Sequence, residues 1–330
     1  MGKVQFEKKP KPYLREWKDM SGEDFAQVDH ANTVVCVTLS PMEVHGPHLP
    51  VVTDVWEAEC LMERTIELLH EAHPKLQFLR LPSLFVASDV VPQSGSVQFR
   101  PSTIIRVVED LGRSLAKQGF RDIWVTSFHG GPRHFVPIEV ACDRVNRKYN
   151  TRMLSVFSML IGRLTKGSSD LSDVFSEIEG VSREDLAGDA HGGAVETSMM
   201  LYLLGEKVKG GYEDLPQRTV ERVLEEAGKA PLQKGAKPTL WELLRGFRYK
   251  IRYFEEDSYA GKPSVSSAEL GQQMFDILSK HSQLALDEVL NGTTPMSACH
   301  SPLWPVRWAF TMPLIGWVFE RVVGFRSAVW

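Results

Sequence analysis

Short apolar runs separated by longer amphipathic stretches predict how the first half of the chain folds. Residues 34–39 form a nearly unbroken apolar run rich in β-branched side chains. Such a run is typical of a parallel strand that is covered on both faces. A second buried strand is predicted at 122–127, and shorter strands are expected at 76–81, 84–87 and 153–159.

Helices are predicted between these strands. Residues 54–70 carry their apolar side chains on one stripe, and residues 102–119 repeat with a helical period, with Ser102 as a candidate N-cap. A third helix is expected to follow Gly131 and to end near Tyr149. Alternating helices and strands of the parallel type predict a layered α/β fold with right-handed crossovers.

The ends and two inner regions depart from this pattern. Residues 1–13, with four lysines and two prolines, predict a mobile arm ahead of a domain at 14–290. The polar and acidic residues 165–190 indicate a long loop or lid, and the charge runs at 206–262 indicate an insertion. Residues 291–330 form a tryptophan-rich C-terminal tail.

Composition excludes several classes of protein. The 330 residues include 38 Lys and Arg against 42 Asp and Glu, a net charge of −4, which gives no electrostatic basis for binding nucleic acid. Four scattered cysteines exclude a disulfide scaffold or a zinc knuckle. The first residues lack the apolar segment of a signal peptide, so we expect a cytoplasmic protein.

The loop after the first buried strand carries the densest chemistry, E-V-H-G-P-H-L-P at 43–50 followed by Thr-Asp at 53–54. In open α/β sheets, ligands bind outside the carboxyl ends of the strands. Glu43 and His45 are two residues apart and point the same way in an extended loop, where carboxylate and imidazole suit Zn or Mn. Asp54 is either a third ligand or a helix N-cap. His48 is interpreted as a hydrogen-bonding loop residue.

Two further motifs lie at corresponding places. His129 follows the strand at 122–127, where it is either a ligand or an incidental residue of a strand-to-helix turn. The run D-A-H-G-G-A-V-E-T-S at 189–198 places Glu196 on an apolar helical stripe. A carboxylate there is costly unless it is paired or bound to a cation, although the helix dipole also favours a Glu in the first turn.

Together the motifs resemble those of the creatininase (creatinine amidohydrolase) family. The family loop E-x-H-G-P-H-L-P with T-D matches residues 43–54, and its D-x-H-A-G-E-x-E-T-S matches 189–198. A late G-x-P…A-x-E-x-G segment resembles residues 259–271. The second motif, N-G-H-G-G-N, differs here at Ser127, Phe128 and Pro132, and the third differs at Ala194.

The resemblance implies a three-layer α/β/α fold with a mostly parallel central sheet and two divalent metal ions, Zn or Mn, with Fe as a further candidate. The implied metal ligands are Glu43, His45, Asp54, His129 and Glu196. Asp54 would bridge the ions, with Glu43 and His129 on one and His45 and Glu196 on the other. His191 would transfer a proton during catalysis.

The function that the resemblance implies is metal-dependent hydrolysis of a C–N bond in a small cyclic amide or formamide, by a homo-oligomer that could be a hexamer. Creatinine is not the expected substrate, because no tryptophan lies between Trp124 and Trp241. The alternative is an inactive relative that binds a small molecule or a protein partner. A nucleotide-binding α/β protein is excluded because no phosphate-binding loop follows a strand.

The tail outside this resemblance holds four of the eight tryptophans at 302–330. Its uncharged stretch at 308–319 is 12 residues long, short of the ~20 needed to span a bilayer. We expect the tail to pack on its own domain or on a neighbouring subunit. Contact with a membrane surface is the weaker alternative.

Overall fold

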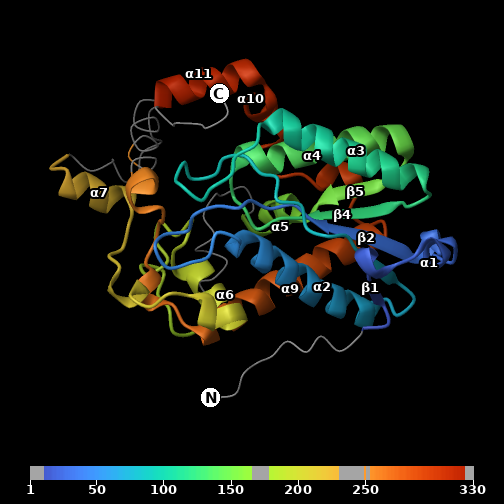
Figure 1. The fold of residues 1–330 in the computed structure, drawn as a ribbon, viewed down its shortest axis with the longest axis horizontal. Coiled ribbons are helices and arrows are strands. Elements are labelled where there is room, and N and C mark those ends of the chain that lie inside the picture. Colours follow the sequence, from blue (N-terminus) through green and yellow to red (C-terminus); the bar gives the residue numbers. More distant parts are fainter. Residues whose placement is uncertain (1–10, 166–177, 230–248, 250–252, 324–330) are drawn as a thin grey trace.

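A five-stranded parallel sheet forms the centre of the molecule (Figure 1). The computed structural model describes residues 11–165, 178–229, 249 and 253–323 of the chain. The strands run in the order β1-β3-β2-β4-β5, and every neighbouring pair is parallel. Their bounds are β1 (Leu14–Glu16), β2 (Thr33–Thr38), β3 (Gln77–Arg80), β4 (Asp122–Thr126) and β5 (Arg152–Ser155).

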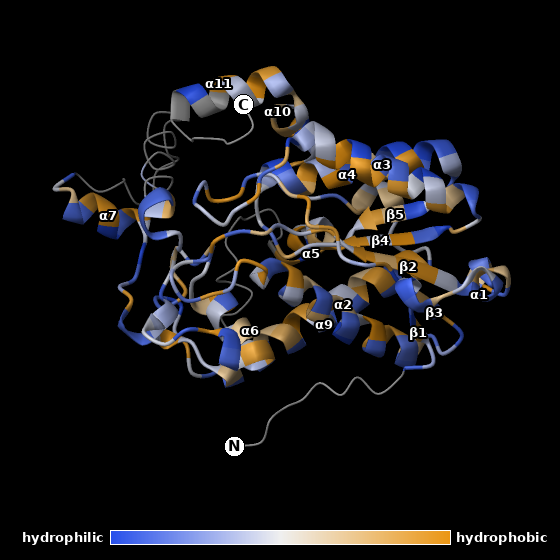
Figure 2. Cartoon of the chain, in the orientation of Figure 1, coloured by the Kyte–Doolittle hydropathy of each residue, from blue (hydrophilic) through white to orange (hydrophobic). Residues whose placement is uncertain are grey.

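Helices cover both faces of this sheet (Figure 1). One face packs against α3 (Pro101–Lys117) and α4 (Pro132–Tyr149), and the other against α2 (Thr53–Ala72) and α9 (Ala268–Leu290). β2 contributes Val35 and Val37 to the first core and Val34 and Cys36 to the second, because successive side chains of a strand point to opposite faces. Figure 2 shows the resulting hydrophobic strands between helices that are polar on their outer sides. The predicted three-layer α/β/α fold with a parallel sheet is confirmed.

Shorter elements surround the three layers. Further α-helices are α1 (Gly22–Ala26), α5 (Val156–Thr165), α6 (Ala194–Leu204), α7 (Val220–Glu226), α10 (Trp308–Thr311) and α11 (Pro313–Val323). The 3-10 helices are η1 (Trp17–Asp19), η2 (His30–Asn32), η4 (Gly205–Lys207), η5 (Tyr212–Asp214), η6 (Pro263–Val265), η7 (Met296–Ala298) and η8 (Trp304–Val306).

One of the short strand predictions is wrong and another is too long. Residues 84–87 form no strand, and only a single bridge joins Leu84 to Leu39 beside β2. The strand predicted at 153–159 ends at Ser155, after which the chain continues as α5. An apolar run of this length is buried in either conformation, so its pattern cannot separate a strand from a helix.

The predicted N-cap of α3 is also wrong. Ser102 lies inside the helix, which begins at Pro101 after Arg100 at the N-cap position. Proline suits the first helical position because its fixed φ is already helical and the missing N–H would have no partner there.

The region ahead of β1 contacts the domain where it is described. Lys11 donates to Glu63 at 2.8 Å, and the ring of Tyr13 stacks on that of His70 with centroids 3.8 Å apart. The first ten residues of the predicted arm lie outside the described residues, as do 166–177 of the predicted lid. The described remainder of that lid, from 178 on, contains turns and no helix or strand.

The C-terminal tail packs only partly on its own chain. Trp304 stacks on His300 with ring centroids 3.7 Å apart, and Gly316 of α11 lies against the guanidinium of Arg133. Trp308 remains 54% exposed and Leu314 67% exposed within the single chain. Among the described helices, none has the length and apolar character that crossing a bilayer requires.

Candidate metal centre

The five residues expected to bind metal meet at the carboxyl edge of the sheet. Glu43 and His45 lie in the loop after β2, and His129 lies in the loop after β4. Asp54 and Glu196 occupy the first turns of α2 and α6. Each is at most 9% exposed, so charged and polar groups from four segments are buried together.

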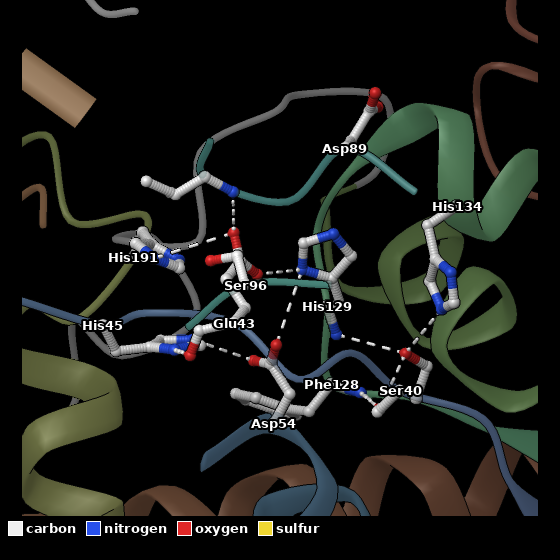
Figure 3. A network of polar contacts seen from close by, with 12 residues as sticks. Ser40, Glu43, His45, Asp54, Asp89, Ser96, Phe128, His129, His134 and His191 are labelled. Atoms are coloured by element: carbon white, nitrogen blue, oxygen red, sulfur yellow. Dashed lines mark hydrogen bonds and ion pairs between the residues drawn. The ribbon is translucent and has the colours of Figure 1, made fainter. Parts of the chain in front are cut away.

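Their side chains form two groups that share one aspartate, and a third group joins Glu43 and His45 to His191. Figure 3 shows Asp54 in contact with both His45 and His129. The His129 group consists of Glu43, Asp54 and His129, and the His45 group of His45, Asp54 and Glu196. Within each group the candidate ligand atoms lie within 4.8 Å of one another. This sharing of Asp54 is the arrangement expected of a bridging carboxylate between two cation sites.

The two carboxylate oxygens of Asp54 face different histidines. Oδ1 lies 3.2 Å from Nε2 of His45, and Oδ2 lies 3.6 Å from Nδ1 of His129. The outer carboxylates complete the groups: Nδ1 of His129 is 3.0 Å from Oε2 of Glu43, and Nε2 of His45 is 3.6 Å from Oε2 of Glu196.

Backbone carbonyls orient both imidazole rings. Nδ1 of His45 lies 2.9 Å from the carbonyl oxygen of Glu43, and Nε2 of His129 lies 3.0 Å from that of Ser88. A carbonyl can only accept, so these nitrogens carry protons, and the other nitrogen of each ring faces the carboxylates. Metal-binding histidines are held by this second hydrogen bond, which fixes the tautomer and the ring orientation.

Some carboxylate oxygens have hydrogen bonds and others have none. Oε1 of Glu43 accepts from the backbone N–H of Val91 at 2.6 Å, and Oε2 of Glu196 accepts from that of Gly192. Among the described residues, Oε2 of Glu43 and Oδ2 of Asp54 accept no hydrogen bond, and both face Nδ1 of His129, the ring nitrogen that the Ser88 contact leaves without a proton in the neutral ring. Buried carboxylate oxygens in this state are costly unless a positive charge faces them.

Without cations, the histidines supply that positive charge. Burial disfavours the charged ring of His45, but the carboxylates of Asp54 and Glu196 outweigh it and raise its pKa to about 10. Burial likewise lowers the pKa of His129, but the carboxylate of Glu43 outweighs this effect and raises the pKa to about 9. Divalent cations could take over this role, and the mixed carboxylate and imidazole donors fit zinc or manganese.

His191 lies beside these groups. Its ring stacks on that of His45 with centroids 4.0 Å apart (Figure 3), and its Nε2 lies 2.8 Å from the carbonyl oxygen of Val44. Nε2 therefore carries the proton, and Nδ1 is the nitrogen free to accept one. Burial and the neighbouring charge of His45 lower the pKa of His191 to about 4, so the ring is neutral near pH 7.

The structure also bears on the alternative interpretations of single residues. Asp54 is not a helix cap, because Val52 occupies the N-cap position of α2. Glu196 lies in the first turn of α6, accepts from the backbone N–H of Gly192 ahead of that helix and also contacts His45, an arrangement consistent with both of its interpretations. His48 lies outside both groups, and its Nε2 is 2.8 Å from Oγ1 of Thr197.

Supporting residues around the centre were not predicted from the sequence. Ser88 and Asp89 come from an irregular loop, where Asp89 adopts φ 63° and accepts from the backbone N–H of Arg133 at 2.6 Å. Their residue types carry no signal for this placement. Glu57 is buried one turn after Asp54 on α2, and both of its carboxylate oxygens lack a hydrogen-bond partner among the described residues. Its spacing of three from Asp54 could have indicated that it lies near the site.

A family model and several solved structures of known proteins match this chain, and they agree with one another. The family model described as creatininase, creatinine amidohydrolase, matches residues 18–283. A manganese creatininase is 17% identical, with a TM-score of 0.56 over 85% of this chain and 99% of that one. A protein described as a creatinine amidohydrolase from Bacteroides fragilis NCTC 9343 is 18% identical, with a TM-score of 0.55 over 83% of this chain and 95% of that one.

A third solved structure is a variant creatininase of the Zn–Zn type. It is 16% identical, with a TM-score of 0.56 over 85% of this chain and 98% of that one. At these identities the three structures establish the fold alone. No protein in the curated set matches the chain.

Proposed function

This chain belongs to the creatininase family, and we propose that it is a metal-dependent amidohydrolase that cleaves a C–N bond in a cyclic amide or formamide. The observation that carries the proposal is the pair of buried three-residue groups sharing Asp54. The hydrogen bonds that aim one nitrogen of His45 and one of His129 at the carboxylates support it.

The proposed cofactors are two divalent ions, zinc or manganese, held by the His129 group and the His45 group. Solved creatininases in manganese and Zn–Zn forms support this choice of metals. When bound, such ions would supply a Lewis acid for the amide carbonyl and lower the pKa of a water molecule.

The protein's own residues would hold the reactants and move the proton. His191, fixed through Nε2 by the carbonyl of Val44, offers Nδ1 to accept a proton from the attacking water. The same ring can then donate that proton to the amide nitrogen as the C–N bond breaks. Pro47 and Pro50 stiffen the loop that carries Glu43 and His45, which limits their movement during the reaction.

The proposed substrate is a small molecule, and the proposed assembly is a homo-oligomer. The exposed Trp308 and Trp317 on the tail support an interface between subunits, because apolar surface of this kind is costly to leave in water. Creatinine is not the substrate we propose, because the stretch between Trp124 and Trp241 holds no tryptophan to contact it.

Metal analysis of the purified protein, followed by a screen of lactams and formamides with and without chelator, tests this function. We expect stoichiometric zinc or manganese and a hydrolase activity that EDTA removes and added metal restores. The variant His48→Gln serves as a nearby control and should retain its metal, because His48 lies outside both groups. A protein that binds no divalent metal at micromolar concentrations would contradict the proposal.

A further inference from the structure

A cavity of ≈ 80 Å³ opens beside the candidate metal centre. A single water needs about 10–15 Å³ of such space, so this cavity can hold a group of several heavy atoms. Four of its lining side chains come from one helix, α5, and occupy one face of it at spacings of three, four and seven. They are Phe157, Leu160, Ile161 and Leu164.

The cavity is continuous with the proposed catalytic site. Glu196 of the His45 group lines it, as does Gly130, which follows His129 directly. Phe128, on the other side of His129, forms a further part of the wall, and its ring meets that of Phe157 edge-on with centroids 6.3 Å apart. A molecule whose reacting atoms lie near Glu196 therefore has an adjoining space into which another part of it can extend.

The wall away from Glu196 is apolar. Leu186, Val195 and Leu278 join the face of α5, and the other acidic group in the lining, Asp189, already accepts from the backbone N–H of Ala194. An ordered water needs two to four polar partners, which the α5 side does not offer. An apolar group would gain from leaving water here, whereas a charged or strongly polar group would lose its hydration without replacement.

We propose that the substrate is an amide carrying an apolar alkyl or aryl group that occupies this cavity, with its scissile bond beside Glu196. This inference rests on the proposed function and narrows its substrate class. Phe128 and the apolar face of α5 are then the specificity-determining residues. The substrates excluded are small polar amides, which leave the cavity unfilled.

Hydroxamic acids of increasing chain length test the proposal, because their headgroup binds divalent metals and mimics an amide. Calorimetry with the zinc-loaded protein should show hexanohydroxamate binding up to ~200-fold more tightly than acetohydroxamate, given ~0.8 kcal/mol for each of the four added methylenes. Leu164→Asn should reduce this ratio by at least ~10-fold while the affinity for acetohydroxamate stays unchanged. Equal affinities of the two hydroxamates for the wild-type protein would overturn the proposal.

A control variant, a substitute variant and a metal-free measurement make the outcome decisive. Leu111→Asn makes the same change at a partly buried leucine on α3, outside the cavity, and should leave the ratio unchanged. Ile161→Asn replaces Leu164→Asn if that variant does not fold. In the EDTA-treated protein, 1-hexanol should bind more tightly than ethanol, by ligand-detected NMR, and Leu164→Asn should remove the difference.

The two proposals fail differently. If acetohydroxamate does not bind the zinc-loaded protein, the metal-dependent function fails, and the alcohol comparison alone decides whether the cavity takes apolar groups. If acetohydroxamate binds but hexanohydroxamate binds no more tightly, the function stands and the substrate class is wrong.

Discussion

Asp54 offers the sharpest test of a paired metal centre, because it is the residue that the His129 group and the His45 group share. Asp54→Asn keeps the size of the side chain and removes its charge. Each group would then retain two of its ligands, fewer than the three protein ligands of a catalytic zinc site. We expect the metal content to fall from two ions per chain to less than one. Glu196→Gln affects only the His45 group and should leave one ion.

Thermal stability gives the same test a second measure. Metal at 100 times its Kd stabilises a protein by ~2.7 kcal/mol. An unfolding entropy of ~2.1 cal/mol/K per residue means that each kcal/mol raises the Tm of this 330-residue chain by roughly 1.4 °C, so loading two ions should raise that of the wild type by about 8 °C. Asp54→Asn should lose this increase, and Glu196→Gln should keep part of it.

The assay combines metal analysis by mass spectrometry with thermal melts in the presence of zinc or EDTA. Glu67→Gln is the matched control, since it changes a carboxylate to an amide on the same helix, at a side chain that is 42% exposed and pairs with Lys11. It should bind metal like the wild type. If Asp54→Asn and Glu196→Gln lose the same amount of metal, the two groups do not share a ligand and the reasoning fails.

Three further predictions concern the proton donor, the pH response and the tail. His191→Ala should cut turnover by ~10²–10⁴ while the metal content is unchanged, and loss of metal would instead make His191 a ligand. In the EDTA-treated protein, the pKa of His129 is raised from 6.5 to about 9, so its stabilising charge is complete below pH 6.5 and is lost as the pH rises through 9. The Tm of the EDTA-treated protein should therefore fall between pH 6.5 and 9. A Tm that rises over this range would refute the stabilising role of the His129 charge. Deleting residues 302–330 should lower the oligomer size in light scattering with the metal retained, whereas binding of the full-length protein to lipid vesicles with no change in oligomer would favour a membrane-surface role.

The central sheet and the meeting of the motifs could be predicted because both depend on local signals. The apolar runs of β2 and β4 are strong enough to identify buried strands, and parallel strands bring the loops that follow them to one edge. Glu43 and His129 therefore had to lie near one another once the strands were recognised. The grouping around Asp54 came from the family resemblance and agrees with the geometry, whereas the binding of metal itself stays a prediction.

Other features could not be predicted, because tertiary contacts decide them. β1 has three residues, too few to show any periodicity, and it forms through pairing with β3. The helical conformation of α5 is not distinguishable from a strand in a short apolar run, and the cavity beside Glu196 depends on it. Likewise, the carbonyl of Ser88 that holds His129 belongs to a loop placed by the surrounding core.

The all-parallel sheet also governs the order in which the chain can fold during synthesis. Neighbouring parallel strands need a long crossover, so the sheet has no hairpin that could form early from adjacent residues. β1 has no partner until β3 has left the ribosome, and β2 gains its second neighbour only when β4 emerges. Glu196 is synthesised later still, so the nascent chain exposes apolar strands well before the candidate metal centre is complete. We therefore expect chaperones to bind the nascent chain during synthesis.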